Sequence, residues 1–323
     1  MATTPEAYDA YLRGAWLLSS EAGPGRFLRA RESFARAIDL DPGFAPAYVG
    51  LARARTMSEV GPESRRAVRE ALSKAIALDD DLPTAHSALA MLLFYREFDV
   101  DGARRSFERA IEINPDYAEA HQSVAACYSV RGQHDLAIAS VQQARRIDPL
   151  SSMIGSDIGW YYYFARRFDE AIEHCRRTRE LDPGFYWAEL CIQLSLQQQG
   201  DWAGLVEEAR RQIRELDPEA EELARLENDD PKDAARTVWE WRLRHMEIHA
   251  QTAFVAPADL AQLHMALGNQ DRALQLLEEG FELRAGWILP FLTVDPLFDP
   301  LRGDPRFDDL VTRIAGDELR ASR

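Results

Sequence analysis

A three-residue string punctuates this chain at a nearly constant interval. It consists of leucine or isoleucine, then aspartate or asparagine, then proline, and it occurs at residues 40–42, 113–115, 147–149, 181–183 and 216–218. The last four prolines are 34, 34 and 35 residues apart, and Leu78-Asp79-Asp80 is a degenerate copy in the gap before them. A period of 34 residues predicts an array of similar supersecondary units, each contacting its neighbours, in place of one large core.

Each period has small and apolar residues at fixed distances before its proline. The residues twelve and eight positions before it are Ala30 and Phe34, Ala103 and Phe107, Ala137 and Val141, and Ala171 and Cys175. Spacings of three and four residues lie on one face of a helix, and the proline ends that helix. A second helix begins about three residues after the proline and carries a pair such as Leu51-Ala52, whose small member we expect at the contact between helices. The pattern predicts repeated helical hairpins.

These positions resemble the tetratricopeptide repeat. The resemblance runs almost continuously from Tyr8 to about Pro218 and returns between Leu260 and Leu277. It implies an all-α fold, a right-handed superhelical solenoid of stacked helix-turn-helix hairpins with a C-terminal helical cap. We expect about six hairpins over residues 1–218, an irregular helical segment over 219–253, a further hairpin over 254–285 and the cap over 286–323. Within the irregular segment, the Asp230-Pro231 pair predicts the start of a helix.

The two ends of the chain carry a more particular likeness. Residues 286–288 (Gly-Trp-Ile), the Asp-Pro turns between 295 and 305, and residues 7–14 together resemble the repeat region attached to bacterial signalling proteins. That resemblance implies a position behind a kinase, a nucleotide cyclase or a winged-helix regulator. The sequence itself contains no effector motif of this kind: neither Lys74 nor Lys232 follows a glycine as in a phosphate-binding loop, and no Asp-Phe-Gly triplet is present.

The charge balance excludes several classes of partner. Lys and Arg number 38 against 54 Asp and Glu, which gives a net charge of −16. Nucleic acids and anionic membranes are bound through clustered basic residues, so we expect neither as a partner. The first residues do not form a signal peptide, and no apolar run approaches the roughly 18 residues that span a bilayer. Three cysteines without a Cys-x-x-Cys pair indicate reduced, packed thiols, and we expect a cytoplasmic protein.

Candidate catalytic and metal-binding residues are few. His245 and His249 stand four apart, a spacing that suits a metal ion, but nothing nearby supplies a third ligand. His86 and His121 occupy the same phase of successive repeats, where the family consensus has a large aromatic residue, so we expect a packing role for both. We therefore predict no catalytic residue, no metal and no cofactor.

The resemblance implies a ligand-binding groove lined by the first helix of each hairpin. Carried over by phase, its proposed contact residues are Met91, Phe94, Tyr95, Gln122, Trp160, Tyr163, Phe164, Trp187, Leu190 and Leu194. These ten residues come from four repeats, the third to the sixth. The groove positions of those repeats include no Lys, Arg or Asn, so we expect no clamp for a terminal carboxylate there.

An apolar, aromatic groove suits a partner's amphipathic helix or an extended peptide with bulky anchors. The sequence leaves two other occupants of the groove as alternatives: the C-terminal segment of the chain, through Trp287, Phe291 and Phe298, or a small molecule. We predict a non-enzymatic scaffold or adaptor that binds a protein or peptide, and a homodimer stays open. The alternative is a sensory or oligomerising arm of a bacterial signalling system, and a hydrolase or metal-dependent enzyme built on the array is the third hypothesis.

Overall fold

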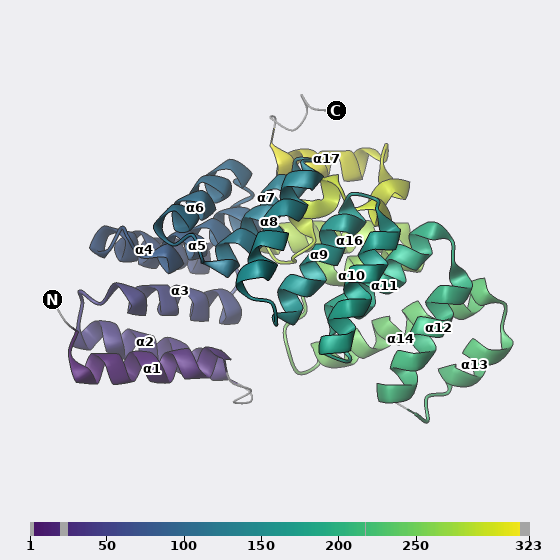
Figure 1. Ribbon diagram of the computed structural model, residues 1–323, viewed down its shortest axis with the longest axis horizontal. Helices are drawn as coiled ribbons and strands as arrows, with labels where there is room; N and C mark the ends of the chain where they lie inside the picture. The colour runs from purple at the N-terminus through teal and green to yellow at the C-terminus, as the bar shows by residue number, and fades with distance from the viewer. Residues whose placement is uncertain (1–2, 20–24, 217, 317–323) are drawn as a thin grey trace. The chain divides into compact units, whose positions relative to one another are not determined.

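The computed structural model describes residues 3–19, 25–216 and 218–316, and this part of the chain is all helical (Figure 1). Helices account for 80% of it and no described residue lies in a strand, which confirms the all-α fold class. The chain divides into two compact units, Met1–Cys127 and Tyr128–Arg323. None of the described helices combines the length and the apolar character needed to cross a bilayer.

The first unit consists of consecutive helical hairpins. Its helices are α1 (Pro5–Ser19), α2 (Arg26–Leu40), α3 (Ala45–Ser58), α4 (Pro62–Leu78), α5 (Pro83–Leu92) and α6 (Val100–Ile113), with a π-helical turn, Leu93–Glu97, after α5. Each of these helices packs against the next one in the sequence. Helix α7 (Ala118–Val130) follows and continues across the boundary between the units.

Small residues allow these helices to approach closely. The ring of Phe34 on α2 is 1% exposed and leaves no room for a Cβ atom at Gly14 on α1 or at Gly50 on α3. Ala52 and Ala90, the small members of the repeated pairs on α3 and α5, are almost completely buried, as the sequence predicts. The repeat pattern thus reflects packing: a bulky ring on one helix fits where the two neighbouring helices carry small side chains.

The turns between hairpins use the recurring aspartate or asparagine. Asp41 accepts a hydrogen bond from the backbone N–H of Gly43 at 3.0 Å, and Asp79, Asn114 and Asp148 make the same bond two residues ahead. Such a local hydrogen bond stabilises a turn in competition with the helix, so the helix ends at that point.

A second hydrogen bond fixes each turn to the following helix. His86 and His121 place Nε2 at 2.8 and 2.9 Å from the carbonyl oxygens of Asp80 and Pro115, six residues earlier, and the Tyr48 hydroxyl donates to the Pro42 carbonyl at 3.1 Å. Both histidines thus tie the turn to the following helix; His86 is buried and His121 is half-buried, and a packing role for the two stays a prediction.

The second unit continues the hairpins and ends in shorter elements. Its helices are α8 (His134–Ile147), α9 (Ser152–Phe164), α10 (Phe168–Leu181), α11 (Tyr186–Gln199), α12 (Trp202–Leu216), α13 (Glu222–Asn228), α14 (Pro231–Ala250), α15 (Pro257–Ala266), α16 (Gln270–Leu283) and α17 (Pro305–Ala315), with 3-10 turns Leu289–Thr293 and Pro296–Leu301 before α17. Helices α12, α13 and α15 contact α14, and the 3-10 turn Pro296–Leu301 contacts α11 and α15. Cys127, Cys175 and Cys191 are buried and form no disulfide in the described part of the chain, as the sequence predicts.

Candidate functional site

The aromatic residues of α9 are covered by the chain's own C-terminal segment. Trp287 stands edge-on to Trp160 with ring centroids 5.1 Å apart, and Phe291 stacks on Phe164 at 4.8 Å. The Trp160 indole N–H donates to the Trp187 carbonyl at 3.1 Å. Trp160 and Phe164 are therefore only 4% and 2% exposed.

Polar contacts hold this segment in place. The Tyr163 hydroxyl donates to Oδ1 of Asp295 at 3.1 Å, and the Leu297 N–H donates to the same oxygen at 2.8 Å. Asp295 is fully buried, and this burial raises its pKa to about 7. Arg166 forms an ion pair with Asp299 at 2.7 Å at the edge of the same contact.

The structure separates the ten proposed groove residues into groups. Five of them, Trp160, Tyr163, Phe164, Leu190 and Leu194, are buried within the second unit and offer no surface to a partner in this conformation. For the α9 positions the alternative in which residues 287–298 fill the groove matches the contacts, because the rings pack on Trp287 and Phe291. These contacts join α9 to residues more than 120 positions later in the sequence, so the spacing within the repeats does not predict them.

The other five residues differ in exposure. In the first unit Phe94 is buried, with its ring 4.8 Å from that of Tyr95, while Met91 is 37% exposed and Tyr95 and Gln122 are half-buried. Their role in binding stays a prediction. Trp187, in the second unit, is half-buried and lines an open pocket.

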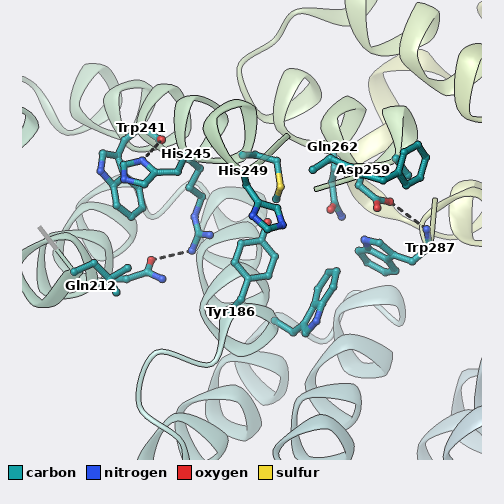
Figure 2. Close-up of a pocket in the computed structure, with 15 residues that line it drawn as sticks. Tyr186, Gln212, Trp241, His245, His249, Asp259, Gln262 and Trp287 are labelled. Atoms are coloured by element: carbon teal, nitrogen blue, oxygen red, sulfur yellow. Dashed lines mark hydrogen bonds between the residues drawn. The ribbon is translucent and has the colours of Figure 1, made fainter. Parts of the chain in front are cut away.

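This pocket has a cavity volume of about 470 Å³, and five Phe, Tyr and Trp side chains are among the residues that line it (Figure 2). Its lining residues are Tyr186, Trp187, Gln212, Leu216, Trp241, Arg242, His245, Met246, His249, Phe254, Val255, Ala256, Asp259, Gln262 and Trp287. They come from α11, α12, α14, α15, the loop before α15 and the segment after α16. Helix α14 contributes residues spaced by one, three or four positions, so one face of that helix forms a wall.

A buried arginine forms part of this wall. Arg242 is 4% exposed; its Nε donates to Oε1 of Gln193 at 2.6 Å and its Nη2 to Oε1 of Gln212 at 2.9 Å. The guanidinium carbon stands 5.4 Å from the ring centre of Tyr186. Burial lowers the pKa of Arg242 from its ordinary value, although an arginine stays charged at any pH at which proteins fold.

The other polar groups of the pocket have different environments. Asp259 accepts a hydrogen bond from the Trp287 backbone N–H at 3.1 Å. Gln262 is 2% exposed, and its Nε2 has no hydrogen-bond partner among the described residues. Nδ1 of His245 lies 2.9 Å from the Trp241 carbonyl. Within the described ranges no three His, Cys, Asp or Glu side chains are grouped to hold a metal ion.

Of the residues that line this pocket, Trp187 was predicted as a groove residue and His245 and His249 were weighed as a metal pair, whereas Arg242 and Gln262 were not predicted. The signal for Arg242 was weak: a basic residue beside the apolar face of α14 usually reaches solvent. Its burial depends on glutamines from α11 and α12, about 50 and 30 residues earlier in the chain.

Comparisons with known proteins agree with the repeat pattern. Residues 94–154 match the tetratricopeptide repeat model. The small glutamine-rich tetratricopeptide repeat-containing protein 2 of Mycosarcoma maydis is 35% identical over 85 residues, which are 26% of this chain and 24% of that protein. The chain thus spans about a quarter of the length of this curated relative.

Solved structures show the same fold at low sequence identity. PilW, a type IV pilus biogenesis factor, is 15% identical with a TM-score of 0.56 over 69% of this chain and 99% of its own. TTC0263, a tetratricopeptide repeat protein of Thermus thermophilus, is 21% identical with a TM-score of 0.51 over 59% and 99%. Human IFIT1, in a structure of its dimer with m7Gppp-AAAA, is 17% identical with a TM-score of 0.53 over 87% and 72%. At these identities the likeness concerns the fold alone.

Proposed function

We propose that this tetratricopeptide repeat protein is a non-enzymatic scaffold that binds a polypeptide through the aromatic pocket around Trp187, Trp241 and Trp287. Proteins of this repeat class generally mediate protein–protein interactions. The observation that carries the proposal is an aromatic cavity of about 470 Å³ that the chain's own described segments leave open. The aromatic residues Trp160 and Phe164 of α9, by contrast, are already covered by the C-terminal segment.

The pocket has the properties of an anchor site for bulky side chains. Its volume falls in the range of about 300–1,000 Å³ that is typical of ligand sites. Binding energy at protein interfaces concentrates where a large apolar side chain enters a rigid, desolvated pocket with aromatic walls. Phe254, which is 62% exposed at this pocket, adds an apolar group that a partner would cover.

Binding fits the lining residues better than catalysis does. The described side chains that line the pocket include no serine, threonine, cysteine or lysine that could act as a nucleophile. Asp259 is engaged by the Trp287 N–H and His245 by the Trp241 carbonyl. The cytoplasmic location and the alternative role in a signalling system remain predictions; a kinase, cyclase or winged-helix gene beside this one would support the second.

A peptide selection tests the proposal. A random peptide library displayed on phage is selected on the wild-type protein, and the dissociation constants of enriched peptides are measured by fluorescence polarisation. Phe254→Ala, which removes an exposed ring, is expected to weaken binding about tenfold or more. The matched control is Leu150→Ala, because Leu150 is 78% exposed and lies outside the pocket. Failure to enrich any peptide, or equal affinities for Phe254→Ala and wild type, would overturn the proposal.

A further inference from the structure

The buried guanidinium of Arg242 has no carboxylate partner. Among the described residues no carboxylate oxygen lies within 4.0 Å of it, and its side-chain hydrogen bonds go to neutral groups, the amides of Gln193 and Gln212 and the hydroxyl of Tyr186. Glu189, a fully buried carboxylate whose charge acts on Arg242, is already held by Arg211 at 2.5 Å and by Arg179 at 3.9 Å. The pocket wall therefore contains a desolvated positive charge that no anion of the described chain balances at close range.

Such a charge favours an anionic ligand. A buried ion loses its hydration, and neutral hydrogen-bond partners restore only part of that loss. We propose that the pocket binds a carboxylate joined to a bulky apolar group, with the carboxylate at Arg242 and the apolar group against Trp187 and Trp287. This inference rests on the proposed polypeptide-binding function, and it names the chemistry of the partner: an aromatic or large aliphatic residue next to a carboxylate.

A second observation points to the same ligand chemistry. Gln262 lines the pocket and is 2% exposed, and its Nε2 lacks a hydrogen-bond partner among the described residues. Its side chain extends toward the space between His249 and Trp287 (Figure 2). The Nε1 of Trp241, another pocket residue, also has no partner within the described part of the chain. Unsatisfied donors in the wall of a pocket favour a ligand that supplies acceptors.

The charged groups around the pocket favour one orientation of the anion and a single negative charge on it. Gln212, which binds Arg242, and Asp259, which binds Trp287, lie on opposite sides of the pocket (Figure 2). A carboxylate would be attracted to the Arg242 side and repelled from the Asp259 side. With one buried arginine and one nearby aspartate, a singly charged carboxylate is favoured over a doubly charged phosphate.

Two ligands that differ only in charge test the inference. N-acetyl-L-tryptophan and its neutral amide, N-acetyl-L-tryptophanamide, are titrated into the full chain by isothermal calorimetry at pH 7. The acid is expected to bind about tenfold more tightly, in line with a charge-assisted hydrogen bond. Gln262→Leu, which keeps the volume and removes the donor, is expected to weaken binding of both ligands and to leave the preference in place, because the acid and the amide each offer an acceptor oxygen. Arg242→Met is expected to abolish it, provided that its circular dichroism melting curve shows a folded protein.

The possible results separate the two proposals. Equal affinities of the acid and the amide for wild type would overturn the carboxylate inference and leave an apolar anchor site in place. Absence of binding by both ligands at millimolar concentration would overturn the inference too, and enriched library peptides that still depend on Phe254 would then keep the scaffold function. Because the wild-type comparison uses no substitution, it decides the matter even if Arg242→Met does not fold.

Discussion

Replacing Asp295 with asparagine should remove a pH dependence that this carboxyl gives to the stability of the second unit. Asp295 belongs to the C-terminal segment and is completely buried; its Oδ1 accepts bonds from Tyr163 and Leu297, and its Oδ2 has no partner among the described residues. Burial, with a smaller contribution from the charge of Asp299, raises its pKa from 3.8 to about 7. Asparagine keeps the accepting oxygen and has no charge at any pH.

The size and sign of the effect follow from this shift. Below about pH 4 the carboxyl is protonated in both the folded and the unfolded chain, and above about pH 7 it is ionised in both. Between these values the folded state binds more protons, so the free energy of unfolding falls as pH rises. A shift of about three pKa units at about 1.36 kcal/mol each amounts to about 4 kcal/mol. Asp295→Asn should therefore resemble wild type near pH 4 and be more stable by up to about 4 kcal/mol at pH 8.

Urea unfolding followed by tryptophan fluorescence measures this difference. Of the seven tryptophans only Trp16 lies in the first unit, so the signal reports mainly on the second. The control is Asp135→Asn, because the Asp135 side chain is fully exposed and its removal should shift the profile by a constant amount at most. Parallel profiles of Asp295→Asn and wild type from pH 4.5 to 8 would refute the reasoning, since they would mean that Asp295 is ionised in the folded state throughout.

Two further predictions concern the packing of the hairpins. Gly159→Ala should lower the free energy of unfolding by about 1–3 kcal/mol, because a Cβ there would overlap with Cys175 Sγ and lie 3.1 Å from the Ala171 carbonyl oxygen. Calorimetric melting measures the change, and Gly43→Ala, in an exposed turn, is the control. A melting curve of Gly159→Ala that matches that of wild type would contradict the prediction. The thiols of Cys127, Cys175 and Cys191 should react with Ellman's reagent only after denaturation, because all three are buried and burial raises the pKa of Cys175. Stoichiometric labelling of the native protein would argue against that packing.

The hairpins were predictable from the sequence because their determinants are local. Asp41, Asn114 and Asp148, each directly before a proline, accept a bond from the N–H two residues ahead, and the small and bulky positions lie within one or two adjacent helices. The residues that determine the start of α14 are also local, since the helix begins at Pro231 as the Asp-Pro pair predicts. There Asp230 accepts a bond from the Lys232 N–H at 3.0 Å, and proline suits the first position of a helix.

The exposure of the candidate site was not predictable in the same way. The repeat phase predicted Trp160 and Phe164 as groove residues, but it carries no information on what Trp287 and Phe291 contact. Likewise, one arginine in α14 is buried only because two glutamines reach it from earlier helices. These contacts join residues that are distant in the chain, so each depends on how whole helices pack.

Trp287 links the covered aromatic residues of α9 to the open pocket. Trp287 stands edge-on to Trp160 at 5.1 Å and edge-on to Trp187 at 5.1 Å, and its backbone N–H holds Asp259. One side of the pocket therefore exists only while the segment after α16 is docked on α9 and α11. A partner that binds between Trp187 and Trp287 would stabilise the docked segment, because binding energy adds to the folded form that has the site. The contact that covers Trp160 is thus also the contact that builds one side of the pocket.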